Sequence, residues 1–203
     1  MYSTMIPLTS LERVHSGRPL HEAVAQEAET IGAKRVFVVC SHTLNTKTDV
    51  IEKVRKALGP KLVGVFDAVR PHVPREDVSA AVNKAEPLQP DLLVSIGGGS
   101  ATDLTKILAL CLKHGLRTPE SMEAYHLVVN ADHTVTAPVF EGPDIPVVIA
   151  PTTLSGGEFN ALSGATDKVT NVKQGYVHPK MTARAIILDP AICVHTPEWI
   201  WMS

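Results

Sequence analysis

Cysteine is scarce in this sequence and is not spaced for a disulfide framework or a zinc site. The three cysteines among 203 residues, Cys40, Cys111 and Cys193, stand far apart and form no Cys-x-x-Cys pair. They lie in or beside apolar runs, where free thiols act as small hydrophobic side chains. This usage is typical of a reducing compartment, so we expect a cytoplasmic location.

Long apolar runs and an excess of one charge are also missing. No window approaches the roughly 20 apolar residues that span a membrane. The first residues do not form the basic and then apolar pattern of a secretory signal. Because the formal net charge is −2, with acids and bases interspersed, nothing favours nucleic acid or an anionic membrane as partner. We therefore expect a small-molecule ligand.

The nine histidines do not have the spacing of a metal site. No two of them stand three or four positions apart on an expected helix. His42, His72 and His178 fall in expected loops, and His114 falls near a helix end. We interpret each as a surface or supporting residue, and we predict no metal ligand in this chain.

The sequence does contain a regular alternation of helical and strand-like patterns. We expect these elements, in chain order, over 19–31, 35–40, 47–58, 62–66, 74–86, 92–96 and 147–150. Such alternation with continuous apolar strands predicts a Rossmann-like α/β fold, a parallel sheet with helices on both faces. A surface excursion with a short helix near 121–125 is expected within 118–143. A hairpin and a last strand over 185–188 complete the expected domain, residues 1–195.

The most informative segment follows the strand at 92–96. Gly97, Gly98 and Gly99 are followed by Ser100 and a helical pattern, which predicts a strand, a glycine turn and a helix start. Glycines let a ligand come close to the backbone, and the free N–H groups of the helix start suit a phosphate or pyrophosphate. The spacing differs from the Gly-x-Gly-x-x-Gly fingerprint. The structural alternative is that Ser100 caps the helix and Asp103 completes a capping box.

Parallel strands end at the same edge of a sheet, so the loops that follow them are expected to meet there and form the ligand site. The polar loops in question are 41–43, 67–72, 97–100 and 151–153. The sequence therefore predicts one site built from four loops.

Four segments, in their order and spacing, resemble the N-terminal domain of the iron-containing alcohol dehydrogenase family, in the branch of the maleylacetate reductases. They are Phe66–His72, Ile96–Lys106, Pro151–Glu158 and Ile187–Pro190. The resemblance covers nearly the whole chain. It implies an α/β domain that binds NAD or NADP. It also implies, in the complete enzymes, an all-helical second domain, which this chain lacks.

The resemblance also implies a set of cofactor-binding residues. They are Ser41, His72, Gly97, Gly98, Gly99, Ser100, Asp103, Thr152, Thr153, Ser155 and Lys173. Within this set, it assigns the pyrophosphate to 98–100, the nicotinamide end to Asp103 and the cofactor ribose to Lys173. A plain alternative for Lys173 is a solvated lysine on a hairpin.

Ser41 and His72 match positions that reach the adenosine side of the cofactor. Some iron-dependent relatives carry an aspartate at the position of Ser41, and an acid there would repel a 2′-phosphate and favour NAD. Since Ser41 has no charge, NADP stays open beside NAD.

The implied activity is hydride transfer between the nicotinamide cofactor and an alcohol, a carbonyl compound or a maleylacetate-like substrate. In iron-dependent relatives the metal ligands lie in the helical domain, so iron or another divalent metal would come only with that domain. We therefore name no catalytic residue and expect the isolated chain to be inactive. The alternatives are an NAD-dependent lyase resembling 3-dehydroquinate synthase and a noncatalytic nucleotide-binding fragment.

The end of the sequence contains a helix-start signal, Thr196-Pro197-Glu198, after which only Trp199 to Ser203 follow. We expect 196–203 to be the start of a truncated helical domain, because its apolar side chains would seek a partner surface. A contact within a homodimer is the competing explanation.

Overall fold

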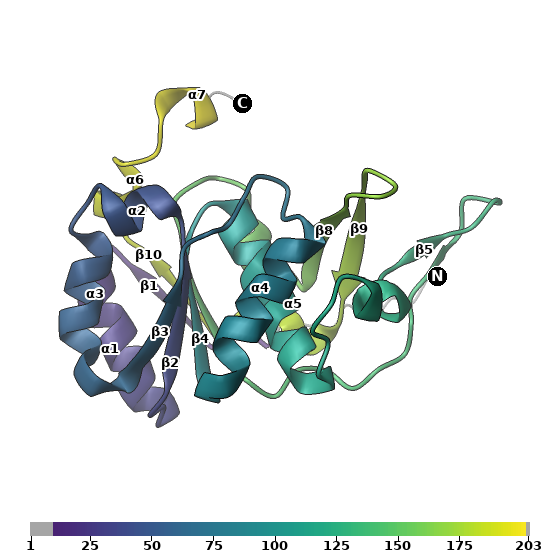
Figure 1. The fold of residues 1–203 in the computed structure, drawn as a ribbon. Helices are drawn as coiled ribbons and strands as arrows, with labels where there is room; N and C mark the ends of the chain where they lie inside the picture. Colours follow the sequence, from purple (N-terminus) through teal and green to yellow (C-terminus); the bar gives the residue numbers. More distant parts are fainter. Residues whose placement is uncertain (1–9, 202–203) are drawn as a thin grey trace, which may run out of the picture.

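The computed structural model describes residues 10–201, and a six-stranded parallel sheet forms its centre (Figure 1). The strands are β1 (Arg13–Ser16), β2 (Val36–Cys40), β3 (Leu62–Phe66), β4 (Leu92–Gly97), β7 (Val147–Pro151) and β10 (Ala185–Leu188). They lie in the order β1-β10-β7-β4-β2-β3, and every neighbouring pair is parallel. The predicted Rossmann-like α/β class is therefore confirmed.

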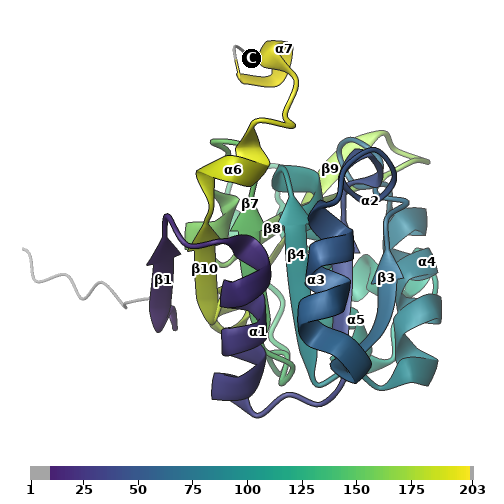
Figure 2. The ribbon, with the colours of Figure 1, turned by 90° about the vertical axis from the view of Figure 1, so that its left-hand side faces the viewer.

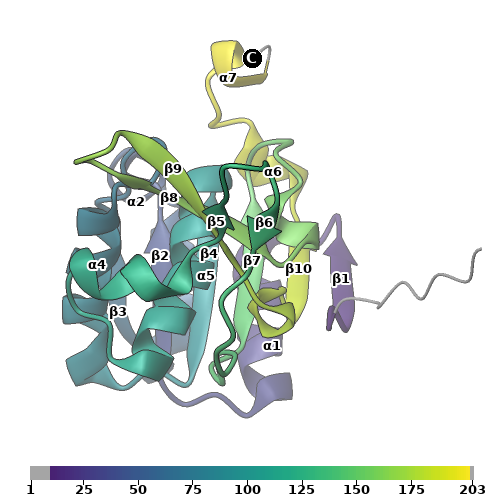
Figure 3. The same cartoon turned by 90° about the vertical axis from the view of Figure 1, so that its right-hand side faces the viewer.

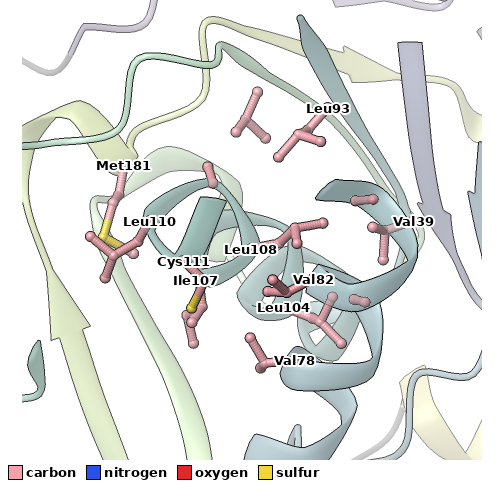
Figure 4. Close-up of a cluster of buried hydrophobic side chains, with 14 of the residues drawn as sticks. Val39, Val78, Val82, Leu93, Leu104, Ile107, Leu108, Leu110, Cys111 and Met181 are labelled. Carbon is pink, nitrogen blue, oxygen red and sulfur yellow. The ribbon is translucent and has the colours of Figure 1, made fainter. Parts of the chain in front are cut away.

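Helices cover both faces of the sheet, as predicted (Figure 2). The four longer ones are α1 (Leu20–Ile31), α3 (Val50–Leu58), α4 (Arg75–Ala85) and α5 (Gly99–His114). The first two pack into one buried cluster and the last two into another. Figure 4 shows the second cluster, where Val78 and Val82 of α4 meet Leu104 and Leu108 of α5.

The inner strands β2, β4, β7 and β10 are almost wholly apolar because both of their faces are buried. Val38 belongs to the cluster under α1 and α3, whereas the next residue, Val39, belongs to the cluster under α4 and α5. Successive side chains of a strand point to opposite faces, so a strand between two helical layers needs an apolar residue at every position.

The elements that were not predicted include the edge strand β1 and the short helix α2 (His42–Thr46). The edge strand β1 has the sequence Arg-Val-His-Ser, and its polar side chains bind a carboxylate that is buried on α1. Glu27 accepts from Arg13 Nε at 3.0 Å and lies 2.6 Å from His15 Nε2. The prediction that His42 lies in a loop is wrong, since it is the first residue of α2.

The remaining elements lie outside the main sheet. An antiparallel hairpin, β8 (Leu162–Asp167) and β9 (Val172–Val177), confirms the predicted one. The excursion at 118–143 contains the 3₁₀ helix η3 (Glu120–Tyr125) and a small ribbon of β5 (Val128–Val129) and β6 (Val135–Thr136) (Figure 3). The other elements are η1 (Gly59–Lys61), η2 (Glu86–Leu88), η4 (Gly157–Phe159), η5 (Pro179–Met181), α6 (Pro190–Cys193) and α7 (Glu198–Trp201).

The predicted segments 1–195 and 196–203 extend beyond the described residues at both ends of the chain. Residues 1–9 of the first segment and 202–203 of the second lie outside them. Within residues 10–201, no helix has both the length and the apolar character needed to cross a membrane.

Candidate functional site

A cleft with a volume of about 1230 Å³ opens at the carboxyl edge of the sheet. Its walls come from the loops after β2, β3, β4 and β7, from the β8–β9 hairpin and from the segment that leads into α7. The four polar loops therefore meet, as their positions after parallel strands predicted. The volume exceeds the roughly 300–1,000 Å³ of common small-molecule pockets, so the cleft has room for an extended ligand.

All of the predicted site residues except Gly97 line this cleft. They are Ser41, His72, Gly98, Gly99, Ser100, Asp103, Thr152, Thr153, Ser155 and Lys173. Gly97 is the last residue of β4 and leads into the turn. The sequence thus identified residues that the fold brings together from four loops, a helix and a hairpin.

The glycine turn packs directly against the loop that follows β7. A Cβ atom on Gly98 would lie 3.1 Å from Thr153 Cγ2, and one on Gly99 would lie 3.2 Å from Ser155 Oγ. Gly97 has a φ of 155°, and its Cβ would lie 3.0 Å from that of Ala101. A Cβ atom at any of the three positions would make a tight contact, and its neighbour would have to shift by a few tenths of an ångström, which favours glycine at all three.

Helix α5 begins at Gly99, two residues earlier than a cap at Ser100 would require. Gly98 is the N-cap residue, and no side chain caps the helix. The capping-box alternative for Ser100 and Asp103 is therefore wrong. The first N–H groups of a helix have no acceptor within it, and residues 98–100 border the cleft, so this end of α5 attracts an anion.

Asp103 and Lys173 form an ion pair in the wall of the cleft. Lys173 Nζ lies 3.0 Å from Asp103 Oδ2, and the aspartate side chain is 16% exposed. The lysine side chain crosses Gly164, where a Cβ atom would overlap Lys173 Cε. The ammonium group thus has a carboxylate partner in the cleft wall, while the lysine side chain is 48% exposed, so this contact does not decide between cofactor binding and a solvated hairpin lysine.

The end of β2 lies beside the glycine turn. Ser41 donates its backbone N–H to the Ile96 carbonyl at 3.2 Å, and its hydroxyl accepts the N–H of Leu44 at 3.4 Å, which caps α2. Among the described residues that line the cleft, Asp103 is the only acid, and it is paired with Lys173. The end of the cleft near Ser41 therefore presents no carboxylate from its lining.

Lys106 is a residue to which the sequence analysis gave no role. It is fully buried on α5, and its Nζ donates to the carbonyls of Gly157, Asn160 and Leu162 at 2.8, 2.8 and 2.9 Å. Burial lowers the pKa of Lys106 to about 8, while the nearby carboxylate of Asp103 opposes this shift. The lysine fixes the loop at 157–162 as one wall of the cleft. The signal in the sequence was a single charge among apolar helical positions.

The described residues do not present a metal site. Within residues 10–201, no group of three or more His, Cys, Asp or Glu side chains is arranged to hold an ion. The cleft instead offers groups that suit an anion: helix N–H groups, hydroxyls and a lysine.

Comparison with known proteins identifies the family to which the chain is similar. A model of the iron-containing alcohol dehydrogenase family matches residues 12–190. Dehydrogenase ALT3 of Alternaria alternata is 32% identical over 173 residues, which are 85% of this chain and 44% of that protein. Maleylacetate reductase 1 of Cupriavidus pinatubonensis is 25% identical over 185 residues, which are 91% and 42% of the two proteins.

Solved structures give the same fold. Sulfoacetaldehyde reductase from Bifidobacterium kashiwanohense, in complex with NAD+, aligns with a TM-score of 0.79 at 18% identity, over 98% of this chain and 50% of that one. At this identity the likeness concerns the fold alone. The chain spans about half the length of the relatives that it matches.

Proposed function

Because the chain belongs to the iron-containing alcohol dehydrogenase family, we propose that its cleft binds a nicotinamide dinucleotide, NAD or NADP. The chain would then be the nucleotide-binding half of an oxidoreductase that acts on an alcohol or carbonyl substrate. A maleylacetate-like compound is one such substrate, since a curated relative is a maleylacetate reductase. The glycine turn at the start of α5 is the observation that carries this proposal.

The residues at this turn fit a pyrophosphate. A Cβ atom on Gly98 or Gly99 would point at Thr153 or Ser155, so glycine lets the start of α5 and the loop after β7 lie close together at the cleft. The N–H groups at the start of α5 supply hydrogen-bond donors and partial positive charge for the phosphate oxygens. The hydroxyl groups of residues 152, 153 and 155 border the same cleft and add further donors.

The bound nicotinamide would supply the hydride chemistry, and the protein would supply position. In this proposal residues 98–100 hold the pyrophosphate, while Ser41 and His72 border the adenosine half. The ion pair of Asp103 and Lys173 orients the other half by fixing an ammonium group in the cleft wall. Lys106 keeps the loop at 157–162 in place through its three carbonyl partners and so shapes the cleft around the ligand.

The residues present do not fit a metal ion, since the described part of the chain holds no suitable cluster. We therefore derive no step through a metal and assign no catalytic acid or base. The relatives are about twice as long as this chain. In our proposal, iron or another divalent metal and most substrate contacts belong to a second domain of that kind. We expect the isolated chain to bind nucleotide without transferring hydride.

The two alternatives from the sequence differ in their chemistry and share the nucleotide site. A lyase resembling 3-dehydroquinate synthase would use the same NAD position, but the family match favours the dehydrogenase. A noncatalytic nucleotide-binding role needs only the cleft described above. A cytoplasmic location and a homodimer remain predictions from the sequence.

The test is a calorimetric titration of the 203-residue chain with NAD, NADH, NADP and NADPH. We expect saturable binding of at least one of them with one site per chain. Inorganic pyrophosphate is the matched control ligand, because it reports on the glycine turn alone. A folded chain that binds none of the four dinucleotides would contradict the proposal.

A further inference from the structure

The turn that follows β3 adopts a backbone that its residues disfavour. His72 has a φ of 62° and Val73 a φ of 52°, both in the left-handed region. Val73 is β-branched and fully buried, so it has neither the small size nor the local polar contacts that ease this conformation. Such backbone persists only where the surrounding structure holds it, and it concentrates at ligand sites.

A single residue of the hairpin holds this turn. Thr166 on β8 donates its hydroxyl to the His72 carbonyl at 2.7 Å and its backbone N–H to the Val73 carbonyl at 2.7 Å. Both strained residues are therefore bound by the same partner. On the other side of the turn, the Arg70 N–H donates to Asp77 Oδ2 at 2.9 Å at the start of α4. The turn is thus fixed from two elements at once.

Thr166 holds the turn from outside the lining of the cleft. Residues 70–72 line the cleft, whereas Thr166 does not. The residue directly paired with Thr166 on β9 is Lys173, which forms the ion pair with Asp103 on α5. The hairpin lies beside α5 (Figure 1). The paired residues Thr166 and Lys173 of the hairpin therefore connect the turn after β3 with helix α5.

From these contacts we infer that Thr166 is a positioning residue of the nucleotide site. Its hydroxyl holds the His72–Val73 turn in the shape that receives the adenosine half of the dinucleotide, and it does so without touching the ligand. The inference rests on the proposed function, since the adenosine half is the ligand part assigned to His72. It adds a residue that the sequence comparison did not mark and that acts only through backbone carbonyls.

The experiment compares Thr166→Val with Thr166→Ser in the full chain. Valine keeps the size and the backbone N–H but removes the hydroxyl donor, whereas serine keeps the donor. The probes are NAD, ADP-ribose for the adenosine half and nicotinamide mononucleotide for the other half, all measured by calorimetry. We expect T166V to weaken NAD and ADP-ribose by about threefold to tenfold, the range of one net hydrogen bond. Nicotinamide mononucleotide should be unaffected, and T166S should restore ADP-ribose binding.

The outcomes separate this inference from the proposed function. Unchanged ADP-ribose affinity in T166V would overturn the inference, and so would equal weakening of both half-ligands, because that would indicate general loosening. A wild-type chain that binds none of the probes would overturn the proposed function and the inference with it. Thr166 is only partly buried, so both variants are expected to fold.

A second measurement uses the wild-type chain and does not depend on a variant. Hydrogen exchange is followed with and without NAD for the Thr166 N–H, which donates to the Val73 carbonyl, and for the Val73 N–H, which donates to the Arg70 carbonyl within the turn. A turn that Thr166 holds in advance should be protected before the nucleotide is added. Protection that arises only with bound NAD would contradict a preformed turn and overturn the inference.

Discussion

Two turns at the carboxyl edge of the sheet have unusual backbone conformations that are stabilised in different ways. Both follow parallel strands and border the cleft, and both have backbone conformations that ordinary residues avoid. The turn after β4 uses glycine at 97–99, so its conformation and its close packing carry no side-chain conflict. The turn after β3 uses His72 and Val73, so it depends on hydrogen bonds from Thr166.

The two turns differ in which residues determine their conformation. In the first, the residues themselves allow the shape, and a glycine run in the sequence reveals it. In the second, the shape is imposed by a hairpin that is far away along the chain, because Thr166 lies 94 residues after His72. The first turn is therefore sensitive to changes in its own residues, and the second to changes in its partner.

Gly97→Ala should show the largest loss of stability, because the turn after β4 depends on its own glycines for its conformation. The φ of 155° is unfavourable for alanine, and the new Cβ would lie 3.0 Å from Ala101 Cβ. We expect the free energy of unfolding to fall by about 1–3 kcal/mol. Urea denaturation followed by circular dichroism measures this, and an unchanged midpoint would show that the turn does not need glycine at this position.

Lys106 extends the comparison. It lies on α5 and holds the loop at 157–162, which forms one wall of the cleft, by hydrogen bonds to backbone carbonyls. Its pKa of about 8 lies below that of an unfolded lysine, near 10.5. Between these values the unfolded chain binds a proton that the folded chain lacks, so this group raises the free energy of unfolding as pH rises from 8 to 10.5. Below pH 8 both states are protonated and its contribution is flat.

The matched variant for this prediction is Lys106→Arg, which stays charged over the whole range. We expect the stability of the wild type relative to K106R to grow by about 1–2 kcal/mol between pH 8 and pH 9.5. Urea denaturation at both values provides the difference. A constant difference would mean that Lys106 keeps its charge in the folded chain above pH 8.

His72→Gly and His72→Ala test the strained turn as a pair. Both variants lose the imidazole, but only glycine accepts a φ of 62° without strain. We expect H72G to be more stable than H72A by about 1 kcal/mol, a figure that allows for the greater freedom of glycine in the unfolded chain. Thermal melts of the two proteins decide this, and equal stability would contradict strain at residue 72.

Ser41 directly follows β2, the strand between β4 and β3, and its substitution should give the smallest effect. Ser41→Asp introduces a carboxylate beside the glycine turn, where it would repel a 2′-phosphate. We expect the affinity for NADP to fall about threefold to tenfold relative to that for NAD. Ser41→Asn is the neutral control, and an unchanged ratio in S41D would place Ser41 away from the adenosine ribose.

The features that the sequence predicted are those encoded by local pattern. Apolar runs revealed five of the strands because each contributes side chains to the apolar clusters on both faces of the sheet, and the glycines located the turn. The edge strand β1 was not predicted, because Arg13 and His15 are anchored by Glu27 rather than by an apolar core. The roles of Lys106 and Thr166 were not predicted for a related reason, because each donates to backbone carbonyls that lie 51 or more positions away along the chain.

The central claim is that the glycine turn receives the pyrophosphate of a nicotinamide dinucleotide. Its most direct test is a calorimetric titration of Gly98→Val with the dinucleotide that binds the wild type best, beside the double variant Gly98→Val and Thr153→Ser, which keeps the Thr153 hydroxyl. The second substitution removes the Thr153 methyl group, which a Cβ on residue 98 would meet at 3.1 Å, and so separates internal crowding from ligand crowding. We predict that both variants keep the far-UV circular dichroism of the wild type and lose binding. Wild-type affinity in either folded variant would contradict the claim.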